Sequence, residues 1–159
     1  MPRKFVGDLD QKVCKQMIDL LNANLAETIS LSLAVKQAHW NLKGVGFIGV
    51  HELLDQVVDR LRASADMMAE RAVVLGGFAK GTLEQVAKGA TLAAYPPEIS
   101  PVAEHAEELK TRFMAVGRKL REAITVATDA GDDDTADLFT EASRVLDKDA
   151  WFIGANVPE

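Results

Sequence analysis

The chain lacks the features that mark several protein classes. Its single cysteine, Cys14, excludes an internal disulfide and fits a reducing compartment. No uncharged apolar run approaches the roughly 18 residues of a membrane-spanning helix, and the N-terminus has no hydrophobic signal core. We therefore expect a cytoplasmic protein without a membrane anchor, in which Cys14 is a small buried apolar residue.

Basic residues are also scarce. The chain has 18 Lys and Arg against 24 Asp and Glu, a net charge of −6, which excludes attraction of the whole surface to nucleic acid. The N-terminal arm, residues 1–8, is short and only weakly basic. Weak or absent DNA binding is therefore expected at about 0.15 M salt.

Aromatic residues make up only 6% of the chain, and β-branched residues never alternate over the length of a strand. Apolar residues instead recur with the helical period, which predicts four long helices. The first helix begins near Asp8 or Asp10 and ends before Gly44, and the second covers residues 47–75. The third covers about residues 101–129 with Ser100 as N-cap, and the fourth about residues 134–155. The apolar stripe of the first helix includes Leu25 and Leu33, and that of the fourth includes Leu138, Val145, Trp151 and Phe152.

A connection of about 23 residues, 78–100, separates the second and third helices and can hold a short helix from Thr82 to Ala87. Such a connection is long enough to cross the length of a bundle, so that the third helix runs parallel to the second. We therefore predict one all-α domain over residues 1–159. Its expected architecture is a ferritin-like four-helix bundle with a short helix in the crossover.

Candidate metal ligands follow one side of the second helix. His51 and Asp55 are four residues apart, as are Asp66 and Glu70, and each pair therefore lies on one helix face. Eleven residues from Asp55 to Asp66 make three turns plus roughly 20°, so both pairs share one stripe. Because the pairs lie about 16 Å apart, they cannot share a metal ion within one chain.

Two antiparallel copies of this helix, related by a two-fold axis between residues 60 and 61, would bring the pairs together. Asp55 would then face Asp66, and His51 would face Glu70. In the same arrangement Asp59 would face Arg62, and Ile48 would face Val73. The alternative is a solvated helix face with Asp59 and Arg62 as a local pair, and the helix alone does not decide between the two.

Histidine nitrogen and carboxylate oxygen together suit Fe(II), Mn(II) or Zn(II). His39, at the end of the first helix, offers a further nitrogen ligand, whereas we expect His105 to be exposed on the third helix. Trp40 is expected to be a core residue. No Glu-x-x-His motif occurs, so the usual di-iron site inside such a bundle is missing and the metal must bind elsewhere.

Several segments resemble the Dps family of bacterial mini-ferritins over about residues 15–155. They are KQAHWNLKG, FIGVHELLD, DMMAERAVVLGG, AAYPPEIS, DDDTADLFTEASRVLDK and WFI. The resemblance implies a hollow homododecamer that oxidises Fe(II) with hydrogen peroxide, stores ferric mineral and protects DNA from oxidative damage. It implies iron ligands shared between two subunits: His39, His51 and Asp55 from one, and Asp66 and Glu70 from the other.

The resemblance also places Trp40 beside the iron site and Asp133 and Asp137 in an acidic channel. The alternative for the two aspartates is the ordinary preference for acidic residues at a helix N-terminus. For the whole protein, one alternative is a DNA-coating or structural shell with little ferroxidase turnover. A catalase-like manganese enzyme is a second alternative.

Overall fold

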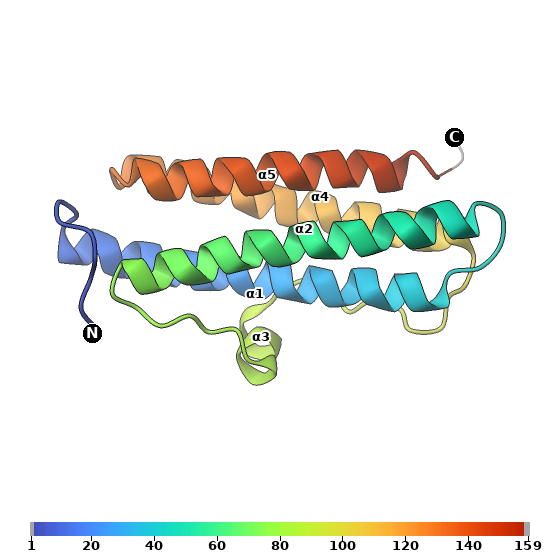
Figure 1. The fold of residues 1–159 in the computed structure, drawn as a ribbon, viewed down its shortest axis with the longest axis horizontal. Helices are drawn as coiled ribbons and strands as arrows, with labels where there is room; N and C mark the ends of the chain where they lie inside the picture. Colours follow the sequence, from blue (N-terminus) through green and yellow to red (C-terminus); the bar gives the residue numbers. More distant parts are fainter. Residues whose placement is uncertain (1, 158–159) are drawn as a thin grey trace.

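Five helices account for most of the chain in the computed structural model, which describes residues 2–157 (Figure 1). Residue 1 and residues 158–159, the two ends of the predicted domain, lie outside the described residues. The helices are α1 (Gln11–Asn41), α2 (Phe47–Val74), α3 (Leu83–Gly89), α4 (Val102–Asp129) and α5 (Asp133–Gly154). The predicted helix limits are confirmed to within three residues.

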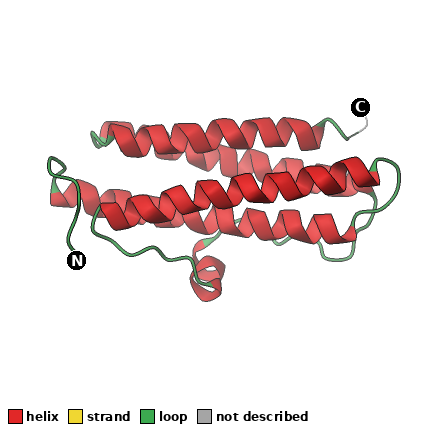
Figure 2. Ribbon diagram, viewed as in Figure 1, coloured by secondary structure: helices red, strands yellow, loops and turns green. Residues whose placement is uncertain are grey.

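The four long helices form two antiparallel hairpins, α1–α2 and α4–α5, packed side by side (Figure 1). The crossover after α2 returns along the bundle and carries α3 beside α1, so that α4 runs parallel to α2. Residues 2–157 contain helices and loops but no strand (Figure 2). The predicted ferritin-like bundle is thereby confirmed. No helix in this part of the chain is long and apolar enough to cross a membrane.

The helix ends follow local chemistry. The Asp10 carboxylate accepts a hydrogen bond from the backbone N–H of Lys12 at 2.7 Å, as an N-cap should. Gly76 ends α2 with a φ of +88°, and a Cβ atom there would lie 2.9 Å from the backbone oxygen of Pro2. The prediction for Ser100 was wrong, because α4 is capped by Pro101 without any side-chain bond. The backbone oxygen of Ser100 instead accepts from the N–H of Lys43 at 2.7 Å.

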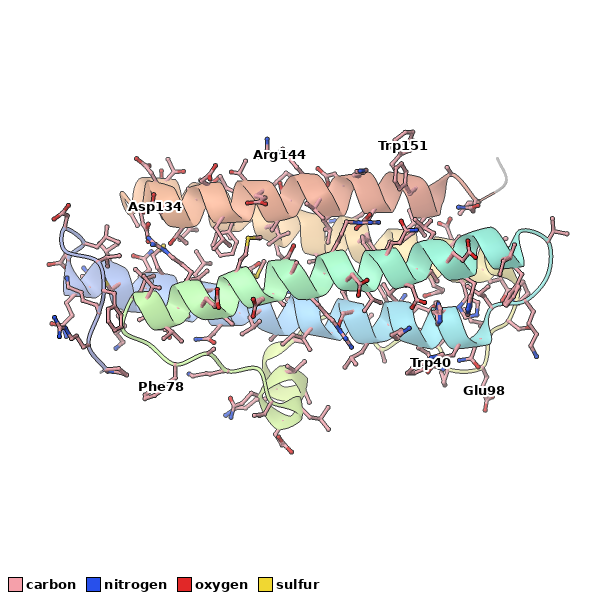
Figure 3. All side chains as sticks on the ribbon, in the orientation of Figure 1. Trp40, Phe78, Glu98, Asp134, Arg144 and Trp151 are labelled. Atoms are coloured by element: carbon pink, nitrogen blue, oxygen red, sulfur yellow. The ribbon has the colours of Figure 1, made fainter. Side chains whose placement is uncertain are left out.

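The core lies between the four long helices, and the prediction that Cys14 is buried is confirmed. Two parts of the predicted stripes were wrong. Leu33 is 53% exposed, because it lies on the outer face of α1. The stripe of α5 is displaced from the predicted positions: Phe139, Leu146 and Ile153 are buried, whereas Trp151 projects away from the bundle (Figure 3). Leu138, Val145 and Phe152 are partly buried at its margin.

The crossover is fastened to α4 by His105 and Arg112. The Tyr95 hydroxyl donates to Nδ1 of His105 at 2.7 Å, and His105 Nε2–H donates to the Ile99 carbonyl at 3.0 Å. Arg112 donates to the backbone oxygens of residues 93 and 94. The prediction that His105 is exposed was therefore wrong: it is 1% exposed, and burial lowers its pKa below the usual value.

Ion pairs with buried carboxylates join the two hairpins. Arg60 of α2 contacts both oxygens of Asp149 of α5, at distances between 2.6 and 3.1 Å. Nearer the other end of α2, Arg71 donates to the Asp132 carboxylate at 2.7 Å. Both arginines lie on α2, so these bonds fix the helix that carries most of the predicted metal ligands against the second hairpin.

Candidate metal centre

The last turn of α1 and the first turns of α2 bring His39, His51 and Asp55 together. The short α1–α2 loop begins α2 at Phe47, after Gly46 with a φ of +81°. The His39 and His51 rings stack with centroids 3.7 Å apart, and His39 is only 6% exposed. Residues twelve positions apart in the sequence therefore form one imidazole pair.

Each histidine is oriented by the backbone of the other. His39 Nδ1 lies 2.9 Å from the carbonyl oxygen of His51, and His51 Nδ1 lies 3.0 Å from the carbonyl oxygen of His39. A carbonyl oxygen can only accept, so both Nδ1 atoms carry a proton. In the neutral rings both Nε2 atoms then have a free lone pair. Such a backbone bond is a common means of orienting histidine ligands toward a metal ion.

Asp55 lies one turn after His51 and faces His39, with His39 Nε2 3.6 Å from its Oδ1 atom. Lys36 of α1 donates to the same oxygen at 2.5 Å. The hydrogen bond from Lys36, together with the nearby positive charges, lowers the pKa of Asp55 although its partial desolvation acts in the opposite direction. The carboxylate is therefore ionised at neutral pH, as a metal ligand requires.

These three side chains are neighbours but do not converge on one point. Within residues 2–157 of a single chain, no three His, Cys, Asp or Glu side chains are placed to hold a metal ion together. Lys36 is the residue that sequence reasoning missed. Its only signal was its position on α1, three residues before His39.

Asp66 and Glu70 lie further along α2 and are exposed, as Asp55 is. Ile48 and Val73, at the two ends of the same stripe, are 62% and 46% exposed. One chain does not bring Asp66 or Glu70 to the histidine pair, so their role as ligands stays a prediction.

The local pairing that offered an alternative to a shared site is not formed. Among the described residues, Asp59 and Arg62 make no ion pair with each other, and both are exposed. Their side chains are thus available to an approaching surface.

Trp40 is 68% exposed, so the prediction that it is a core residue was wrong. It follows His39 directly, and the Lys36 ammonium lies 5.9 Å from its ring centroid. The Lys36 ammonium therefore lies near both the Trp40 ring and the Asp55 carboxylate.

Asp133 and Asp137 are exposed in the first two turns of α5. The neighbouring aspartates stabilise this end of α5. Asp132 caps the helix by accepting from the Thr135 N–H, and Arg71 forms ion pairs with Asp132 and Asp134. Since Asp133 and Asp137 have no such bonds among residues 2–157, their channel role stays a prediction.

Comparison with known proteins places these features in a family. The ferritin-like domain family matches residues 18–158. The chain is 46% identical over 156 residues to the "DNA protection during starvation protein" of Agrobacterium fabrum, covering 98% of this chain and 96% of that protein. It is 34% identical over 152 residues to the protein of the same name from Mycolicibacterium smegmatis, covering 96% and 82%.

Solved structures of Dps proteins have the same fold as this chain. Mycobacterium smegmatis Dps in its tetragonal form superposes with a TM-score of 0.94 at 33% identity, covering all of this chain and 96% of that one. DpsA14 from Streptomyces coelicolor also superposes with a TM-score of 0.94, at 30% identity, covering 99% and 94%.

Proposed function

We propose that this chain, which belongs to the Dps family of ferritin-like proteins, oxidises Fe(II) with hydrogen peroxide and stores the ferric product. The observation that carries the proposal is the stacked pair His39 and His51. Their reciprocal backbone bonds leave both Nε2 atoms free beside an ionised Asp55. Two nitrogens and a carboxylate suit Fe(II), which is the substrate here.

The site becomes complete in the proposal when the α2 helices of two subunits meet antiparallel. The partner's Asp66 and Glu70 would then supply the second half of the ligand set. Exposed Asp55, Asp66 and Glu70 on one face of α2 support this arrangement, because one self-complementary surface then forms two identical sites. A shared site also explains why one chain alone lacks a full ligand group.

The reaction balances as two Fe(II), one hydrogen peroxide and two water molecules giving two FeO(OH) and four protons. Each Fe(II) loses one electron, and the two electrons break the O–O bond of peroxide. The carboxylates would offset the charge of the bound cations, while the oriented imidazoles hold them in place. Consuming Fe(II) and peroxide together removes both reactants of hydroxyl-radical chemistry.

The proposed assembly is a hollow homododecamer that acts in the cytoplasm and holds ferric mineral inside. The fold shared with Dps structures supports it, as does the uncovered stripe from Ile48 to Val73. Asp133 and Asp137 belong to this proposal as the acidic entrance for Fe(II).

The test is anaerobic loading with Fe(II) followed by hydrogen peroxide, with ferric absorbance as the readout. We expect fast oxidation of about two Fe(II) per peroxide, lost in a His51→Ala, Asp55→Ala double variant. An Asp147→Ala variant on α5, away from the site, is the matched control. If the native protein oxidised Fe(II) as slowly as the double variant, the proposed ferroxidase activity would be contradicted. Release of oxygen without a ferric product would instead favour the alternative of a catalase-like manganese enzyme.

A second candidate function is coating DNA. The names of the relatives state DNA protection for those proteins, without saying whether they bind it. The N-terminal arm of this chain is a poor tail for that purpose. Phe5 N–H donates to the Val74 carbonyl at 2.8 Å, and Lys4 Nζ donates to the Leu9 carbonyl. Because the arm lies on the bundle and carries few charges, we propose protection of DNA by iron oxidation rather than by binding.

A further inference from the structure

Lys36 of α1 forms an ion pair with Asp55, which is a ligand in the proposed metal site. The Lys36 Nζ atom lies 2.5 Å from the Oδ1 atom of Asp55. The same Oδ1 atom faces His39, whose Nε2 atom is 3.6 Å away. The oxygen that a metal ion between His39 and Asp55 would use is therefore already bonded to an ammonium group.

The Lys36 ammonium cannot itself be a metal ligand, because its three N–H groups donate and it has no lone pair. A bond from a carboxylate oxygen to a divalent metal ion such as Zn(II) is about 2.1 Å long. A metal ion on Oδ1 would thus lie at most about 4.6 Å from Lys36 Nζ while the ammonium kept its bond. Two cations at that distance repel each other, so metal and ammonium disfavour one another on this oxygen.

Lys36 can leave Asp55 without creating a buried unpaired charge. Its side chain is 25% exposed, and that of Asp55 is 54% exposed. The Trp40 ring centroid lies 5.9 Å from Nζ, within the range of a cation–π contact. The flexible four-carbon stem of lysine allows the ammonium to move toward this ring and toward water while α1 stays in place.

We infer that Lys36 is a tethered cation, which neutralises Asp55 in the metal-free site and which an arriving metal ion displaces from Oδ1. The inference rests on the proposed function, because it takes Asp55 as a metal ligand. In the proposed two-fold arrangement the partner's Asp66 and the partner's Glu70 would approach the same place. Lys36 then offsets part of the repulsion among three carboxylates. The metal site is weaker as a result, because binding has to break the ion pair, and Lys36 thereby sets the affinity of the site.

The test is titration of the assembled, metal-free protein with Zn(II), followed by calorimetry. Zn(II) has no redox chemistry and suits imidazole and carboxylate ligands. The His51→Ala, Asp55→Ala double variant identifies the binding that depends on the site. Lys36→Met removes the charge and keeps an unbranched side chain that favours a helix. We expect this variant to bind Zn(II) about tenfold more tightly than the native chain at the same site.

Two matched variants separate displacement from other effects of the substitution. Lys36→Arg keeps a cation beside Asp55 and should bind Zn(II) no more tightly than the native chain. Lys43→Met removes an exposed lysine from the α1–α2 loop, four residues after His39. It should change the affinity by less than about twofold, because water and salt screen an exposed charge that has no contact with the site.

The direction of the change in affinity decides the inference. If Lys36→Met bound Zn(II) as tightly as the native chain or more weakly, Lys36 would be a support that holds Asp55 in place, and the inference would be overturned. Equal tightening by Lys43→Met would show an effect of net charge alone and would also overturn it. So would a crystal structure with Zn(II) bound to Asp55 in which Lys36 still donates to Oδ1.

Failure of the proposed function gives a different result. If the native chain showed no Zn(II) binding that depends on His51 and Asp55, the proposed metal site would itself be contradicted, and the role of Lys36 with it. Site-dependent binding that is unaffected by Lys36→Met would instead leave the metal site intact and overturn only the inference about Lys36.

Discussion

The ion pair between Arg60 and Asp149 allows a quantitative test of how α2 is held. Asp149 is fully buried, whereas the Arg60 side chain is 30% exposed. Arg60→Ala therefore leaves a buried carboxylate without its partner, which costs about 3–5 kcal/mol. Asp149→Ala leaves a guanidinium that can turn toward water, so its cost should be nearer the 1–3 kcal/mol of a lost charged hydrogen bond, about half as much.

Thermal unfolding at one protein concentration measures the difference. At about 2–4 °C per kcal/mol for a chain of this size, Arg60→Ala should lower Tm by roughly 6–20 °C and Asp149→Ala by clearly less. Arg118→Ala, an exposed arginine on α4, should shift Tm by no more than about 2 °C. An Arg60→Met, Asp149→Leu double variant should recover most of the loss. If Asp149→Ala were the more damaging single change, the argument from burial would be wrong.

Three further predictions concern pH, iron entry and DNA. Burial lowers the pKa of His105 below its ordinary value of about 6.5. The stabilising contribution of the neutral ring is therefore fully present above about pH 6.5 and is lost as the pH falls from there through the lowered pKa. Between about pH 7 and pH 5, Tm should therefore fall more for the native chain than for His105→Gln, and equal slopes would contradict this. Asp133→Ala with Asp137→Ala should slow iron uptake while leaving peroxide chemistry at the site intact, and unchanged uptake kinetics would remove the channel role. A plasmid gel shift should show little binding at about 0.15 M salt, and a clean shift would refute that expectation.

The long helices could be predicted because their signals are local. Capping by Asp10, the glycines that end α2 and the apolar period each act within a few residues. Helix α5 shows the limit of prediction from such local signals. Its apolar residues Trp151 and Phe152 are adjacent in sequence but occupy different faces of α5, and the larger one is exposed.

The errors at His105 and Trp40 have different physical causes. His105 is buried because Tyr95 and Ile99, in an irregular segment, satisfy both of its ring nitrogens. No helical period encodes that contact. Trp40 lies outside the buried stripe of α1, so its size alone was a poor indication of burial.

The candidate ligands on α2 could be proposed from the sequence because His51 and Asp55, and likewise Asp66 and Glu70, have helical spacing. The spacing does not reveal how the rings are turned. The exchange of Nδ1 bonds between His39 and His51 depends on the loop that sets α2 against α1, and the Lys36–Asp55 pair depends on the same packing.

The central claim is that each iron site is shared by two subunits, and co-assembly of two inactive variants tests it most directly. One variant is His51→Ala, Asp55→Ala, and the other is Asp66→Ala, Glu70→Ala. In a mixed pair, one site loses four of its five ligands and the other keeps all five. Random mixing in equal amounts makes half of the pairs mixed, so about a quarter of the sites should be intact. We predict about a quarter of native peroxide-driven Fe(II) oxidation in the mixture and almost none in either variant alone. Activity in either variant alone, or no recovery in a mixture proven to be co-assembled, would contradict the shared site.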